Sequence, residues 1–112
     1  MASIRLYSGE DGESHIEVID PSSHPDWTEL HNAKGIVFRA LPPGFFSDWH
    51  VAPRRQYIIT LSGEAEIGLG DGTVHRLGPG DVNLAEDLTG RGHTTRVVGD
   101  APRVVATVHL DD

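Results

Sequence analysis

Residues 64–77 read Glu-Ala-Glu-Ile-Gly-Leu-Gly-Asp-Gly-Thr-Val-His-Arg-Leu. Two short runs that suit β-strands flank Gly70-Asp71-Gly72, and an Asp-Gly pair supplies the positive φ angles that tight hairpin turns require. The segment therefore predicts a β-hairpin.

The rest of the chain continues this pattern of short strands and turns. Thirteen glycines and seven prolines interrupt it, and no stretch places apolar residues at helical spacing over ten or more positions. One helical turn is expected to begin at Pro25 and run toward Leu30. Regularly spaced short strands predict an all-β sandwich or barrel. The expected strands cover residues 4–7, 15–19, 35–40, 56–61, 65–69, 73–77, 81–84, 94–98 and 103–110.

Length and composition limit the class of protein. At 112 residues the chain can bury one core but not two, so a single domain over residues 1–112 is expected. A formal charge of −8 repels phosphate backbones and anionic lipids, so neither nucleic acid nor membrane is an expected partner. No apolar run approaches the ~20 residues of a membrane span, and the first residues do not resemble a secretion signal, which predicts a cytoplasmic protein. There are no cysteines, so any metal would need nitrogen and oxygen ligands.

The central segment carries the chemistry. Residues 44–63 read GFFSDWHVAPRRQYIITLSG, and after the hairpin come LGPGD at 77–81 and GRGH at 90–93. This arrangement resembles the cupin family, small β-barrels with two motifs on adjacent strands and a metal site between them. The first motif is a Gly, five residues, His-x-His, a few residues, Glu, six residues and Gly. The residues at its spacing are Gly44, His50, Gln56 and Gly63. The second motif is a Pro-Gly-Asp-like turn followed by a His, and Pro79, Gly80 and His93 match it.

The resemblance implies a jelly-roll-like barrel of two antiparallel sheets. The motif-bearing core would cover about residues 35–110, with the N-terminal strands of residues 1–34 added to it. Those strands could pair within the chain or across a dimer, and the resemblance implies a homodimer.

Two of the four metal ligands that the resemblance implies are replaced. Ala52 stands at the second His of His-x-His, and Gln56 stands at the Glu. A divalent ion would have His50, His93 and the neutral amide of Gln56 as ligands, without the anionic one that offsets its desolvation. His50 and His93 are also the expected catalytic residues, because imidazole exchanges protons near neutral pH and is the commonest metal ligand.

Further residues are weaker candidates for this pocket. If the stretch is extended, Asp48 shares a face with His50, although a position in the loop before the strand, facing water, is the favoured interpretation. Trp49 points away from His50, toward burial between the sheets or a subunit contact. Asp87 could reach the barrel mouth, although a turn or cap role is the expectation. The remaining candidates are the possible pocket cations Arg39, Arg91 and Arg96, of which Arg91 is best placed, the neighbouring aromatic residues Phe46 and Tyr57, and His75 and His109, for which exposed or structural roles are expected.

Two functional interpretations follow. In the first, the chain is an enzyme whose barrel holds Fe, Mn, Ni or Zn and acts on a small-molecule substrate, as an oxygenase, isomerase, lyase or cyclase. In the second, it is a metal-free cupin that binds a small ligand, performs modest acid/base chemistry with His50 and His93, or has a regulatory or structural role. Gln56 would then hydrogen-bond a neighbour or a ligand through its amide.

Overall fold

Ten β-strands and one short helix make up residues 3–111, the part of the chain that the computed structural model describes. No helix in this range is long and apolar enough to cross a membrane. The elements are β1 (Ser3–Ser8), β2 (Ser14–Val18), α1 (Pro25–Thr28), β3 (Ala33–Leu41), β4 (Phe46–His50), β5 (Gln56–Ser62), β6 (Glu64–Gly68), β7 (Val74–Leu77), β8 (Val82–Glu86), β9 (His93–Val98) and β10 (Arg103–Leu110).

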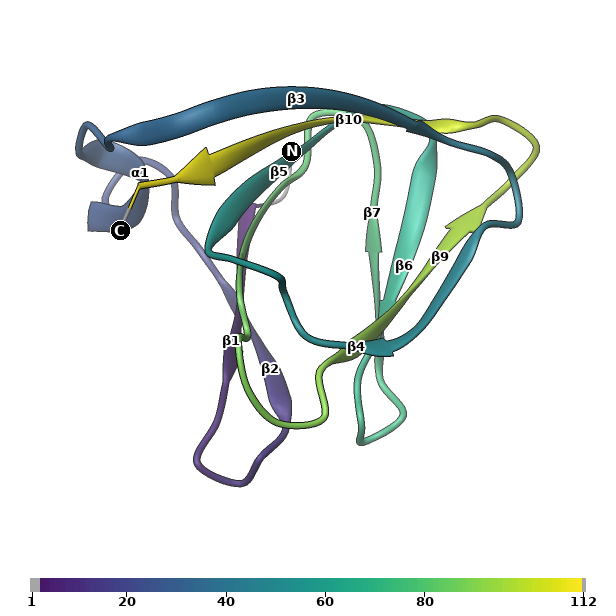
Figure 1. Ribbon diagram of the computed structural model, residues 1–112, viewed down its shortest axis with the longest axis horizontal. Helices are drawn as coiled ribbons and strands as arrows, with labels where there is room; N and C mark the ends of the chain where they lie inside the picture. The colour runs from purple at the N-terminus through teal and green to yellow at the C-terminus, as the bar shows by residue number, and fades with distance from the viewer. Residues whose placement is uncertain (1–2, 112) are drawn as a thin grey trace.

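The strands form two sheets that face each other (Figure 1). The larger sheet has the order β2-β1-β8-β5-β10-β3, and the smaller has the order β4-β9-β6-β7. The predicted all-β, jelly-roll-like barrel is therefore confirmed. One pairing departs from the expected antiparallel pattern, because β1 runs parallel to β8 while it runs antiparallel to β2. The N-terminal strands thus pair within the chain.

The predicted strands all occur, with ends shifted by a few residues. The hairpin forms as expected, and Gly72 adopts the positive φ of +87° in its turn. β4 was not among the predicted strands, because its sequence, FSDWH, contains no β-branched residue and follows a Pro-Pro-Gly turn. The helical turn begins at Pro25 as predicted but ends at Thr28, because Glu29 is already extended.

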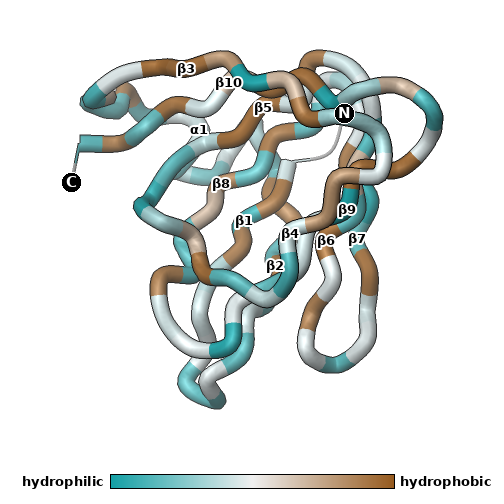
Figure 2. The backbone as a smooth tube through the Cα atoms, turned by 45° about the vertical axis from the view of Figure 1, so that its right-hand side comes forward, coloured by the Kyte–Doolittle hydropathy of each residue, from teal (hydrophilic) through white to brown (hydrophobic). Residues whose placement is uncertain are grey.

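Alternate residues of the strands point between the sheets and form the core. Ile4 and Leu6 of β1 pack there with Ile67 and Leu77 of the hairpin, all four at most 3% exposed. Hydrophobic and hydrophilic residues accordingly alternate along most strands (Figure 2). This cluster fills one part of the interior, and a cavity occupies another.

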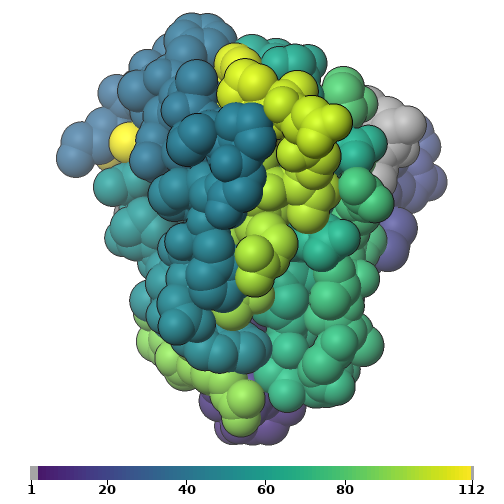
Figure 3. Space-filling model, turned by 90° about the vertical axis from the view of Figure 1, so that its right-hand side faces the viewer, coloured from purple at the N-terminus to yellow at the C-terminus, as the bar shows by residue number. Residues whose placement is uncertain are grey.

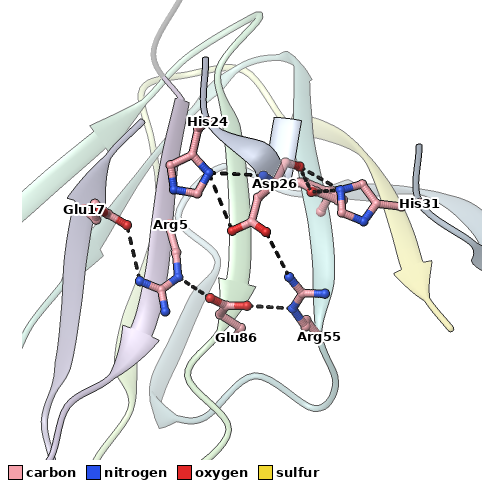
Figure 4. A network of polar contacts seen from close by, with 8 residues as sticks. Arg5, Glu17, His24, Asp26, His31, Arg55 and Glu86 are labelled. Carbon is pink, nitrogen blue, oxygen red and sulfur yellow. Dashed lines mark hydrogen bonds and ion pairs between the residues drawn. The ribbon is translucent and has the colours of Figure 1, made fainter. Parts of the chain in front are cut away.

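A network of charged residues attaches the segment around α1 to the outer face of the larger sheet (Figure 4). Glu86 of β8 accepts hydrogen bonds from Arg5 and from Arg55 Nε, the latter at 2.6 Å. Arg55 also lies 3.5 Å from the carboxylate of Asp26 in α1, and the Tyr57 hydroxyl donates to the Asp26 carbonyl. These contacts fix the connection between β2 and β3 without using any residue of the cavity described below.

β3 forms the free edge of the larger sheet beside β10 (Figure 3). Ile36 and Phe38 are 58% and 65% exposed, and an edge strand presents unpaired backbone groups that can pair with another chain. This edge is where the predicted homodimer should first be sought.

The connection into β9 depends on a glycine. Gly92 has φ +80°, and a Cβ at this position would lie 1.9 Å from the carbonyl oxygen of His50. Gly99, at the other end of β9, has the same φ with nothing within 4 Å of its hypothetical Cβ. The backbones of β4 and β9 can therefore approach each other at His50 only because residue 92 has no side chain.

We predict that Gly92→Ala destabilises the fold much more than Gly99→Ala. Both substitutions carry the cost of a positive φ, about 1–2 kcal/mol. Only Gly92→Ala adds the overpacking against His50, about 1–3 kcal/mol more. Urea unfolding of the two variants measures the difference, and equal losses of unfolding free energy would contradict the close approach.

Candidate functional site

A cavity of about 300 Å³ lies between the two sheets. Its walls come from inward-facing residues of β3, β5, β8 and β10 on one side and of β4, β6 and β9 on the other. This volume is at the lower end for small-molecule sites. The lining residues are Val37, Arg39, Leu41, Phe45, Ser47, His50, Ala52, Pro53, Arg54, Gln56, Ile58, Ile67, Asn83, Ala85, His93, Thr95, Arg103, Val105, Thr107 and His109.

His50 and His93 stand together in this cavity. They are paired across β4 and β9, with ring centroids 4.3 Å apart. His50 Nδ1 lies 2.7 Å from the carbonyl oxygen of Asp48 and 3.1 Å from Ser47 Oγ. Because Nδ1 is held in the wall, Nε2 is the ring nitrogen left for the cavity. The structure thus brings together the two histidines that the sequence singled out.

Asp87 lies behind His93 and has no exposed surface. Its Oδ2 accepts a hydrogen bond from Ser14 Oγ at 2.6 Å and lies 2.5 Å from His93 Nδ1. An ionised carboxylate can only accept, so Nδ1 of His93 carries the proton and donates. The expectation that Asp87 serves as a turn or cap carboxylate is wrong, because the carboxylate orients the imidazole from within the core.

A β-bulge explains where the residues of β4 point. The register against β9 shifts between Ser47 and His50, so both of these line the cavity although they differ in parity. Asp48 instead points to solvent and accepts from the backbone of Trp49. Trp49 faces away from the cavity as expected, but it is 45% exposed rather than buried between the sheets.

The donors around the histidine pair are poorly suited to a divalent metal. Ala52 offers no ligand, and Oε1 of Gln56 accepts a hydrogen bond from Arg54 Nη1 at 3.0 Å. The amide oxygen expected as the third ligand is therefore bonded to a cation. No cluster of three His, Asp or Glu with a metal-binding arrangement occurs within residues 3–111.

The charged side chains that line the cavity are all arginines. They are Arg39, Arg54 and Arg103, and no Asp or Glu of the described chain lines it. The sequence analysis proposed Arg39 and missed Arg54 and Arg103. Only the alternation of inward-facing residues, leading into β5 and along β10, could have indicated these two. Burial lowers the pKa of Arg103 to about 10, so its guanidinium remains charged at neutral pH.

The other cations proposed for the pocket lie elsewhere. Arg91 pairs with Glu13 at 2.8 Å and stacks over Trp49, and Arg96 lies over the ring of Phe46. Arg91 was chosen because it lies two residues before His93, but β9 begins only at His93, so strand alternation does not extend to Arg91.

The remaining candidates divide between the cavity and the surface. His109 lines the cavity and lies 3.2 Å from Arg54 Nη1. Tyr57 lies on the outer face of the sheet, where it packs edge-on against Trp27. Outside the cavity lining are also His15, His24, His31 and His75.

We predict that Asp87→Asn changes the protonation pattern of His93. An amide can replace the carboxylate in shape, but it loses charge-assisted hydrogen bonds worth about 1.5–3 kcal/mol each. The unfolding free energy should fall by that order, and ¹⁵N NMR should show that the Nδ1-protonated tautomer of His93 no longer dominates. An unchanged tautomer in the variant would contradict the role given to Asp87.

Comparison with known proteins identifies the family of this fold. No family model and no curated protein matches the chain. Among solved structures, the chain is similar to an uncharacterised conserved protein with a double-stranded β-helix domain from Klebsiella pneumoniae. Identity is 30%, coverage is 72% of this chain and 70% of that chain, and the TM-score is 0.55.

Two further structures share the fold at lower identity. A cupin domain from Bordetella pertussis is 14% identical over 74% of this chain and 93% of its own, with a TM-score of 0.53. A sugar phosphate isomerase from a cupin superfamily, from Silicibacter pomeroyi, is 20% identical over 97% of this chain and 72% of its own, with a TM-score of 0.55. With the facing sheets, the inward histidine pair and the 30% identity to the Klebsiella protein, the chain belongs to the cupin family of double-stranded β-helix proteins.

Proposed function

We propose that this chain binds a small organic molecule between its sheets and transfers a proton to or from it through His50 and His93, without a resident metal ion. The observation that carries the proposal is the 4.3 Å separation of the two rings, with each Nδ1 held in the wall. Each neutral ring then presents the lone pair of Nε2 to a ligand.

The Nδ1 atoms of the two histidines have different hydrogen-bond partners, and this difference assigns different roles to the two rings. Nδ1 of His93 donates to the buried carboxylate of Asp87, so a positive charge formed on this ring is stabilised by a full negative charge. Nδ1 of His50 has only the neutral oxygens of Ser47 and Asp48 beside it. His93 is therefore the proton acceptor, and His50 binds the ligand beside it and relays the proton.

No metal is proposed, because the donor atoms around the histidine pair do not suit a divalent ion. A divalent ion at the two Nε2 atoms would lack an anionic ligand and would lie near the guanidinium that holds Gln56. The enzyme interpretation that uses Fe, Mn, Ni or Zn would need the ligand or water to complete the coordination shell.

We expect the untagged protein to retain well below one equivalent of metal per chain. Elemental analysis should be made before and after incubation with iron, manganese, nickel and zinc, each followed by removal of the excess. The matched control is the double variant His50→Ala/His93→Ala. Near-stoichiometric metal in the wild type that disappears in the double variant would establish the metal-dependent interpretation instead.

We further expect the histidines to exchange carbon-bound protons with solvent. In D₂O, ¹H NMR would follow exchange next to the carbonyl of dihydroxyacetone and pyruvate, in protein treated with a chelator. His93→Ala should lower the protein-catalysed rate by about 100-fold or more, and His75→Ala, outside the cavity, should leave it unchanged. Exchange that requires added metal, or that survives His93→Ala, would refute the proposed roles.

A further inference from the structure

We infer that the ligand is a small hydroxylated organic anion, whose carboxylate or phosphate group binds Arg103 and whose hydroxyl binds Asn83. This rests on the proposed function, because it assigns a ligand class to the same cavity. Arg103 and Asn83 line the cavity, and each has a buried polar atom without a hydrogen-bond partner in the described chain.

Arg103 is a buried cation with no counter-ion among residues 3–111. The residue is 5% exposed, its Nη2 donates to Thr60 Oγ1 at 3.0 Å, and its Nε has no partner within the described chain. Burying an unpaired charge is costly, so such groups are normally paired. An anion in the cavity would supply the missing partner.

Four other arginines form ion pairs, in contrast to Arg103. Carboxylates pair with the four arginines Arg5, Arg55, Arg76 and Arg91. The chain has seventeen acidic residues and a formal charge of −8, so carboxylates are abundant. Even so, no acidic residue of the part of the chain that the structure describes lines the cavity that contains Arg103. This arrangement would suit an anion that arrives from solution.

Arg39 adds a second guanidinium near the same end. It pairs with Val105 on β10, two positions from Arg103, and both side chains line the cavity. Arginine's planar fork suits the two oxygens of a carboxylate or phosphate. Two such groups make this end the anion subsite.

Asn83 supplies the complementary acceptor in the middle of the cavity. It is 3% exposed, and its Oδ1 has no hydrogen-bond partner in the described chain. It lies opposite Ile58 on β5, between the level of Thr60 and that of Gln56. A ligand hydroxyl would satisfy this oxygen, and an apolar ligand would leave it unpaired at a cost of about 1–3 kcal/mol.

The sheet register then orients the ligand. Arg103 begins β10, whereas His109 near its other end pairs with Gln56, and Gln56 pairs with Ala85, two residues before the Asp87 that holds His93. The anion subsite and the histidine pair therefore lie toward opposite ends of one cavity. The charged group would anchor the ligand while the atom that exchanges a proton reaches His93.

Four compounds on one three-carbon skeleton test the ligand class: glycerate, glycerol 3-phosphate, glyceramide and glycerol. NMR titration at constant ionic strength should show saturable binding of at least one of the two anions. The neutral compounds should bind at least 10-fold more weakly. The ratio between glycerate and glycerol 3-phosphate identifies the anionic group, carboxylate or phosphate.

The substitution Arg103→Met separates binding from folding. Met removes the unpaired buried charge while keeping an apolar chain, so thermal stability should be maintained or increased, while binding of the preferred anion falls at least 10-fold. Arg39→Met should weaken binding of the anion without changing the binding of the neutral compounds. Arg76→Met, on the surface, is the control and should change neither.

Equal binding of glyceramide and glycerate would overturn the anion subsite, as would a folded Arg103→Met that binds the anion normally. If none of the four compounds binds, the inferred ligand class is also wrong. The proposed function is tested separately, because loss of proton exchange in His93→Ala is measured with dihydroxyacetone, which carries no charge.

Discussion

The buried carboxylate of Asp87 connects three segments that are distant in sequence. It accepts from Ser14 on β2 and from His93 on β9, and it follows directly after β8. A charge with no exposed surface is tolerated only when hydrogen bonds replace water. Through Oδ2 this group connects the N-terminal hairpin to the barrel and orients the candidate proton acceptor, while its Oδ1 is buried without a hydrogen-bond partner in the described chain.

Charge is distributed unevenly between the surface and the interior. The acidic excess lies outside the cavity, whereas the cavity wall carries three arginines. The chain has a formal charge of −8, whereas the charged side chains that line the cavity have the opposite sign. Selectivity for small anions over acidic macromolecules would follow at Arg103, because this residue is 5% exposed and only a molecule that fits about 300 Å³ can reach it.

The fold could be predicted largely because local signals agreed with one another. The Asp-Gly turn, the strand lengths and the spacing between Gly44 and Gly63 all indicated one barrel. His50 followed from that spacing, and His93 followed from the second motif. Asp48 faces solvent, as the favoured interpretation expected, and the weaker hypothesis that parity places it in the pocket fails because the bulge before His50 interrupts the regular strand. Arg103 and Asp87 acquire their roles from contacts with Thr60 and Ser14, which are distant in sequence. Arg54 bonds the nearby Gln56 and also lies beside His109 on β10.

The parallel pairing of β1 with β8 has a consequence for how the chain is made. Ser3 pairs with Val82, so on a ribosome that adds ~5–20 residues per second the first strand waits roughly 4 to 16 seconds for its partner. The hairpin of β1 and β2 is at best marginally stable by itself, and Ile4 and Leu6 have no core to enter during that time. The N-terminal hairpin of the nascent chain should therefore be the segment that most needs a chaperone.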